Sequence, residues 1–234
     1  MPGSSLWLLP PETHPLNPIL KTLITVTLPA AFPREAASSP RVVPHFFPAH
    51  VTLTSAISPE AYGDDPQGWL DRLPFPGGTE TGTGTEKERR VKVRFERVAS
   101  QDVFYRRCYV KVEFDGVREV AGIARAAGVL GEEVKVGADG EVSFGGETEK
   151  WLSSWREEFG PHLSLMYGNE PILDGALREV TKIVQQAGIK LCDETEEHGK
   201  DSDGLDGWDG GVIWLVPTDK PISEWGKPIA TRKI

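Results

Sequence analysis

The chain has 234 residues, of which 38% are hydrophobic and seven are Trp, so it can bury a core and is not a disordered polypeptide. A net charge of -9 excludes strong binding to long nucleic acid, and two distant cysteines, Cys108 and Cys192, exclude a disulfide framework or a tetrahedral zinc site. No apolar stretch is long enough to span a membrane and the N-terminus lacks a signal peptide's basic segment, which predicts a soluble cytoplasmic protein.

The first part of the chain predicts two strands and two helices. An apolar run bounded by Ser and Pro is typical of a short strand, and a Pro after Ser is typical of the first turn of a helix. These patterns predict a strand at Leu6–Leu9, a helix at Asn17–Phe32, a strand at His50–Ser55 and a helix from Pro59 toward Leu73.

The middle of the chain alternates strands, helices and Gly-rich segments. The segments 74–90 and 129–147 lack a periodic apolar face and are predicted to be surface loops, the second with room for a small hairpin. Between and after them, the patterns predict strands at 91–95 and 103–114 and helices at 117–128 and 148–159.

The last part carries the strongest helix signal and an acidic segment. Apolar residues at helical spacing predict a helix at Pro171–Ala187 with Gly188 behind it, followed by strands at Ile189–Cys192, Gly211–Pro217 and Lys227–Arg232. The acidic segment 193–211 does not fit a calcium-binding EF-hand loop, because Leu205 and Asp206 stand where that loop needs an oxygen ligand and a glycine. It is predicted to be a surface loop, and no metal site is expected.

Two segments 112 positions apart repeat one pattern. His50-Val51-Thr52-Leu53 and His162-Leu163-Ser164-Leu165 each alternate polar and apolar residues, which is typical of a half-buried strand. In each copy the histidine and the hydroxyl residue therefore point to the same face. If the two strands lie side by side, two imidazoles and two hydroxyls converge on one spot.

This set of groups suits hydrolysis of a cyclic phosphodiester. The reaction needs a base to deprotonate water, an acid to protonate the leaving oxygen and donors that stabilise the phosphoryl oxygens. Histidine serves as base and as acid because its unperturbed pKa lies near neutrality. The pattern predicts a phosphoesterase that requires neither metal nor cofactor.

The two motifs resemble the HxTx/HxSx signatures of the 2H phosphoesterase superfamily. The start Leu6-Trp7-Leu8-Leu9-Pro10 and the segment 162–167, which ends in Met166-Tyr167, are most similar to its plant and fungal 2',3'-cyclic-nucleotide 3'-phosphodiesterases. The resemblance implies a single bilobal α+β domain over 1–234, with two antiparallel sheets lining a central cleft in a pseudo-two-fold arrangement and helices outside. Its motif strands would lie near 50–55 and 162–167.

The resemblance also implies an enzymatic activity and the roles of individual residues in it. Nucleoside 2',3'-cyclic phosphates would be opened to 2'-phosphates, and ADP-ribose 1'',2''-cyclic phosphate to the 1''-phosphate, downstream of tRNA splicing. His50 and His162 would be catalytic, with His162 as base and His50 as acid. Thr52 and Ser164 would bind phosphate. The early Trp7 corresponds to an aromatic that stacks on the base.

Tyr167 is implied to contact substrate as well. Strict strand alternation places it on the face opposite His162, so that role requires the strand to end or bulge near Met166. A monomer in the cytoplasm is expected, and fungal members of the family also admit association with the Golgi.

Two alternatives use the same fold. The first is a 2H enzyme that acts on RNA ends as a ligase-like protein or exonuclease, which the acidic balance disfavours. The second is a non-catalytic nucleotide-binding module. Two complete motifs disfavour it, because binding alone does not need two proton carriers.

Overall fold

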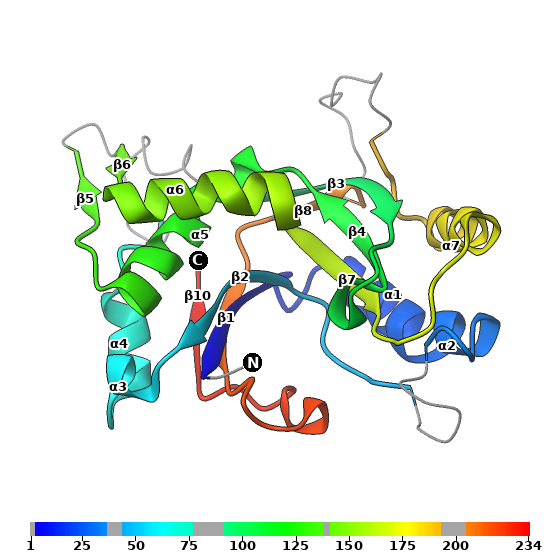
Figure 1. Cartoon of the computed structure of the whole chain (residues 1–234), viewed down its shortest axis with the longest axis horizontal. Helices are drawn as coiled ribbons and strands as arrows, with labels where there is room; N and C mark the ends of the chain where they lie inside the picture. The colour runs from blue at the N-terminus through cyan, green and yellow to red at the C-terminus, as the bar shows by residue number, and fades with distance from the viewer. Residues whose placement is uncertain (1–2, 37–43, 77–90, 138–140, 193–204) are drawn as a thin grey trace.

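The strands form one large antiparallel sheet in a computed structural model that describes all residues except 1–2, 37–43, 77–90, 138–140 and 193–204 (Figure 1). The order of the eight strands across the sheet is β10-β9-β1-β2-β7-β4-β3-β8. They are β1 (Ser4–Leu9), β2 (Val51–Ile57), β3 (Lys92–Ala99), β4 (Cys108–Val112), β7 (His162–Met166), β8 (Gly207–Asp209), β9 (Val212–Val216) and β10 (Ala230–Lys233).

The expected α+β class is confirmed, but the two motif strands belong to one continuous sheet and not to two separate sheets. Strands β2 and β7 pair with Val51 opposite Leu163, and this pairing joins four strands on one side to four on the other. A separate short hairpin is formed by β5 (Lys135–Val136) and β6 (Val142–Ser143). It lies in the segment 129–147, where the sequence left room for a small hairpin. The two motif strands are therefore direct neighbours at the middle of the sheet.

The core explains why the strands alternate. Leu6, Leu8, Val51, Leu53 and Leu163 are all 0% exposed, and they occupy the positions between the polar or aromatic residues of their strands. Because successive strand residues point to opposite faces, these apolar side chains lie on one face of the sheet and the motif residues on the other.

Two groups of helices pack against the sheet, one on the left of Figure 1 and one on the right. Helix α5 contacts β2 and β3, while α7 contacts β3 and α2 contacts β7. The helices are α1 (Leu16–Thr22), η1 (Leu23–Thr27), α2 (Leu28–Ala31), α3 (Pro59–Tyr62), α4 (Pro66–Arg72), η3 (Phe104–Arg106), α5 (Asp115–Arg125), η4 (Ala126–Leu130), α6 (Gly146–Ser154), η5 (Trp155–Phe159), α7 (Asp174–Gln186) and η6 (Ile222–Glu224). No helix in the described ranges is long and apolar enough to cross a membrane.

Three predicted elements differ from the structure. The segment 103–114, expected to be a strand throughout, begins with the short helix η3, and only Cys108–Val112 forms the strand β4. The helix expected from Pro59 toward Leu73 is two short helices, because Gly63 ends α3 with a positive φ of 53° and Pro66 opens α4. The strand expected at Ile189–Cys192 does not form. Lys190 and Cys192 donate backbone hydrogen bonds to Leu205 and Phe95, two different segments, so no ladder develops.

The acidic segment 193–211, predicted to be a loop, ends in a strand. Its residues 193–204 lie outside the described part, but Gly207–Asp209 forms β8 and pairs with β3 at the edge of the sheet. A Cβ at Gly207 would overlap the carbonyl oxygen of Val93, so this pairing requires glycine. The composition of Gly207–Asp209 indicated a loop, but Gly207 instead lets this segment pair closely with β3 as an edge strand.

Candidate active site

The register of the central strand pair brings the two motifs together. Because Val51 lies opposite Leu163 in an antiparallel pair, His50 lies opposite Ser164 and Thr52 opposite His162. Directly opposite residues have Cβ atoms about 5 Å apart. The two imidazoles therefore occupy one diagonal of a four-residue group, and the two hydroxyls occupy the other. This group is called the motif quartet below.

Both histidines are held by the same hydrogen bond. His50 Nδ1 lies 2.6 Å from the carbonyl oxygen of Pro48, and His162 Nδ1 lies 3.0 Å from that of Gly160. A carbonyl oxygen only accepts, so Nδ1 carries the proton in each ring and donates it. Each neutral imidazole therefore has its lone pair on Nε2, the atom left to take or give a proton.

Burial keeps both imidazoles neutral in the free protein. It lowers the pKa of His50 to about 3, with His162 nearby adding to the effect. It lowers the pKa of His162 to about 4, and the positive charge of Arg106 adds to that effect. Both rings are thus proton acceptors at pH 7, and one must gain a proton before it can serve as an acid.

Trp7 packs directly on a motif histidine. Its ring stacks on that of His50 with centroids 3.6 Å apart and an angle of 9° between the planes. The Trp225 ring meets Trp7 edge-on at 5.8 Å. Trp7 is only 2% exposed, so little of its surface is open to a nucleobase. The structure places the ring so that it supports His50.

Tyr167 reaches the face of the motif quartet because its strand ends first. Strand β7 stops at Met166, so strict alternation does not extend to Tyr167. Ser164 Oγ donates to the carbonyl oxygen of Tyr105 at 2.8 Å, and the Tyr167 hydroxyl forms a hydrogen bond with the Ser164 side chain. The predicted phosphate ligand Ser164 therefore already links two tyrosines in the free protein.

Sequence reasoning missed an aromatic wall around the motif quartet. Phe47 stacks on Tyr167 with centroids 3.8 Å apart and meets the His50 ring at 6.1 Å. Tyr109 meets the His162 ring at 5.1 Å. The pair Phe46-Phe47, just ahead of the first motif, was a usable signal. Tyr109 was not, because only the β4–β7 register places it opposite Ser164.

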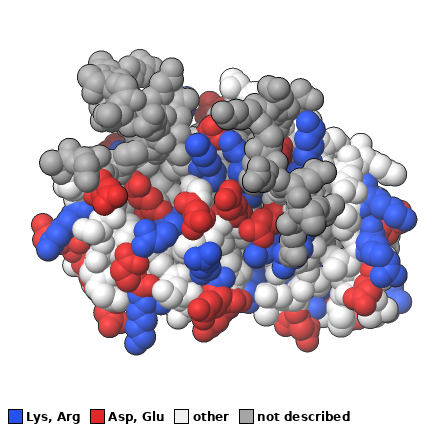
Figure 2. Space-filling model, turned by 90° about the horizontal axis from the view of Figure 1, so that it is seen from above, with Lys and Arg blue, Asp and Glu red and all other residues white. Residues whose placement is uncertain are grey.

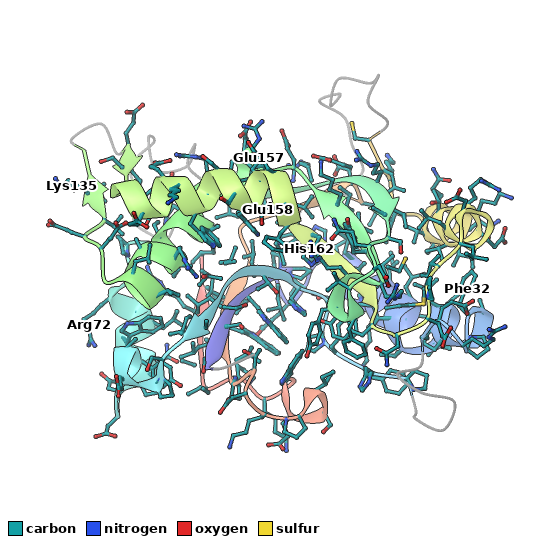
Figure 3. All side chains as sticks on the ribbon, viewed as in Figure 1. Phe32, Arg72, Lys135, Glu157, Glu158 and His162 are labelled. Carbon is teal, nitrogen blue, oxygen red and sulfur yellow. The ribbon has the colours of Figure 1, made fainter. Side chains whose placement is uncertain are left out.

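Charged side chains of both signs cover one face of the molecule (Figure 2), and two acidic residues precede the second motif strand. Figure 3 shows His162 at the start of β7, close to the helix end that carries Glu157 and Glu158. On the face shown in Figure 2, acidic and basic side chains are interspersed over the described surface. Within the described ranges, no group of three or more His, Cys, Asp or Glu side chains could hold a metal ion.

Comparison with known proteins supports the assignment made from the motifs. A family model described as cyclic phosphodiesterase-like protein matches residues 1–234. The chain is 52% identical over 235 residues to a Neurospora crassa protein named 2',3'-cyclic-nucleotide 3'-phosphodiesterase, covering 99% of both chains. It is 39% identical over 238 residues to a Phaeosphaeria nodorum protein of the same name, covering 100% of both. The chain therefore belongs to the cyclic phosphodiesterase-like protein family, as its two motifs predict.

Proposed function

We propose that the protein hydrolyses nucleoside 2',3'-cyclic phosphates to nucleoside 2'-phosphates without a metal ion. The observation that carries this proposal is the motif quartet, in which the buried His50 and the half-buried His162 lie on a diagonal with Nδ1 anchored in the same way. The names of the Neurospora and Phaeosphaeria relatives support the same substrate class.

The diagonal suits an in-line displacement. Diagonal neighbours across an antiparallel pair lie roughly 7–8 Å apart, which leaves room for a phosphoryl group between the two rings. One imidazole takes a proton from water, whose oxygen forms a bond to phosphorus. The bond from phosphorus to the 3'-oxygen breaks, and the other imidazole gives that oxygen a proton.

The surroundings of each histidine favour His162 as base and His50 as acid. The positive charge of Arg106 acts on His162 and favours its neutral form, as a base requires. His50 lies on the face of Trp7, and an indole face attracts a cationic ring. When the anionic phosphodiester enters, its charge raises the pKa of both rings, and Trp7 favours protonation of His50.

Hydroxyl groups would bind the phosphoryl oxygens. Thr52 lies on the same face as both histidines and donates directly. Ser164 donates once its proton turns from the Tyr105 carbonyl to the substrate, while Tyr167 keeps its hydrogen bond to the serine oxygen. We therefore expect Tyr167 to lie behind Ser164 and close to the bound phosphate.

Two finer parts of the proposal, a second substrate and the bilobal symmetry, are supported by shared chemistry and by the strand order. ADP-ribose 1'',2''-cyclic phosphate has the same five-membered phosphodiester ring, so we include it as a substrate and place the enzyme among those that process by-products of tRNA splicing. A pseudo-two-fold bilobal domain is supported by four strands on each side of the β2–β7 junction and by the matching histidine anchors.

Turnover of a cyclic nucleotide in the presence of a metal chelator tests the proposed function. Incubation with 2',3'-cyclic AMP and EDTA is expected to give adenosine 2'-phosphate, identified by phosphorus NMR. Activity that appears only on oligoribonucleotide ends would favour the RNA-end enzyme, and binding without turnover would favour the nucleotide-binding module. Formation of the 3'-phosphate would contradict the proposed leaving oxygen.

Substitution of Trp7 tests how it acts. Trp7→Leu is expected to lower kcat by about 2- to 30-fold, which corresponds to a loss of ~0.5–2 kcal/mol of cation–ring attraction in the step that needs protonated His50. KM changes little. The matched control is Trp214→Leu, since Trp214 pairs with Trp7 across β1 and β9. A KM that rises with unchanged kcat, and that depends on the base, would show that Trp7 binds the nucleobase instead.

A further inference from the structure

Arg106 carries a buried charge that the described part of the protein does not neutralise. The residue is only 9% exposed at the end of η3, and its Nη1 atom is buried without a hydrogen-bond partner. Leaving a charged donor unsatisfied away from water is costly. Such a group is expected where a ligand completes the hydrogen bonding.

Neighbouring cations do not share this property. Lys111 Nζ lies 2.9 Å from Glu96, and Arg107 Nη1 lies 2.8 Å from Asp102. No described carboxylate forms an ion pair with Arg106. Of these three cations close to the second motif strand, Arg106 keeps its positive charge available to an incoming anion.

The charge of the Arg106 guanidinium group acts on the base of the proposed reaction. Its central carbon lies 4.6 Å from the centre of the Phe159 ring, and its charge acts on both Tyr109 and His162. The Tyr109 ring in turn lies 5.1 Å from that of His162. Arg106 thus packs on Phe159, and its positive charge reaches His162 and the neighbouring Tyr109.

The motif itself fixes the backbone of Arg106. Ser164 Oγ donates to the carbonyl oxygen of Tyr105, which belongs to the peptide group preceding Arg106. The backbone carbonyl of Arg106 accepts a hydrogen bond of 3.0 Å from the Gln101 amide. The arginine is therefore positioned by the same serine that is predicted to bind phosphate.

We propose that Arg106 binds a non-bridging oxygen of the substrate's phosphoryl group through Nη1 and stabilises the second negative charge that develops there during hydrolysis. This inference rests on the proposed function. A cyclic phosphodiester carries one negative charge, and addition of hydroxide at phosphorus brings a second. A buried cation already in place stabilises the doubly charged state more than the substrate, which raises kcat. The same charge favours neutral His162.

Substitution by methionine, which removes the charge but keeps an unbranched side chain, is the direct test. Arg106→Met is expected to lower kcat/KM for 2',3'-cyclic AMP by ~10²–10³-fold, mostly through kcat. Its affinity for adenosine 2'-phosphate, measured by calorimetry, should fall at least tenfold, while adenosine binding stays unchanged. Arg106→Lys should restore part of both losses, because lysine keeps the charge but not the planar donor group.

Arg125 provides a matched control. Its guanidinium carbon lies 5.1 Å from the Trp151 ring, and its Nε atom is also buried without a partner. It lies on α5, and burial alone accounts for its lowered pKa. Arg125→Met should change thermal stability only and leave kcat, KM and adenosine 2'-phosphate binding unaltered.

Two outcomes would overturn the inference. One is Arg106→Met protein that is folded by circular dichroism and retains both kcat/KM and adenosine 2'-phosphate affinity within twofold of wild type. The other is a loss of equal size in Arg125→Met, which would show a general effect of removing buried arginines. If Arg106→Met does not fold, Arg106→Gln replaces it in the same comparison.

Failure of the proposed function gives a different result. In that case wild-type protein itself does not turn over 2',3'-cyclic AMP. The calorimetric comparison then decides the role of Arg106 alone, since equal affinity of wild type and Arg106→Met for adenosine 2'-phosphate would reject it.

Discussion

Replacing either motif histidine by alanine is expected to lower kcat/KM for 2',3'-cyclic AMP by ~10²–10⁴-fold, because each removes one proton transfer from the rate-limiting step. The double variant His50→Ala/His162→Ala should lose less than the product of the single losses, since the two groups act in one step. The measurement is initial-rate kinetics at pH 7 on protein shown to be folded by circular dichroism.

A sulfur leaving group separates the two roles. A 2',3'-cyclic substrate with sulfur at the 3' position needs little protonation, since a thiolate leaves more readily than an alkoxide. His50→Ala should recover most of its activity on this substrate, whereas His162→Ala should not. His14→Ala serves as the control, because His14 lies outside the site and accepts a hydrogen bond from the Leu16 amide. Recovery by His162→Ala instead would exchange the assigned roles.

Raising the pH is expected to reduce kcat/KM for 2',3'-cyclic AMP by up to tenfold per pH unit, or roughly 100-fold between pH 6 and pH 8. In the free protein the pKa of His50 is about 3 and that of His162 about 4, so the form with one protonated imidazole becomes scarcer as pH rises through this range. The profile of kcat should decline at higher pH than that of kcat/KM, because bound phosphodiester raises the pKa of the acid.

The 3'-sulfur substrate again provides the control. Its kcat/KM should be nearly independent of pH between 6 and 8, because its leaving group does not need the acid while neutral His162 remains available. A kcat/KM profile for 2',3'-cyclic AMP that is centred near pH 7 would contradict the lowered pKa values. It would place one imidazole in a much more solvated environment than its burial indicates.

Most strands and helices were predictable because their signals are local. Alternation of polar and apolar residues predicted both motif strands, and helical spacing predicted the helix that the structure gives as α7. The break between α3 and α4 is also local, at Gly63 and Pro66, whereas two other errors arose where distant segments decide. Strand β8 exists because Gly207 lets the chain approach Val93, and the segment Ile189–Cys192 fails to pair because its amides bond to two different segments.

The candidate site divides in the same way. Four residues of the motif quartet were found from a repeated pattern, since strand periodicity alone puts a histidine and the second residue after it on one face. The position of Tyr167 depended on where β7 ends, and the stacking of Trp7 on His50 depended on the pairing of β1 with β2. Arg106 belongs to no motif and has no signal in the sequence.

By itself, then, the sequence determined which side chains can carry protons and which strand face presents them, because both follow from residue type and a two-residue period. Only the tertiary structure decided that the strands are paired with His50 opposite Ser164, that desolvation keeps both imidazoles neutral, and that the charge of Arg106 acts on His162. Register, burial and electrostatic environment depend on residues far apart in the chain, so they arise only when those residues pack together.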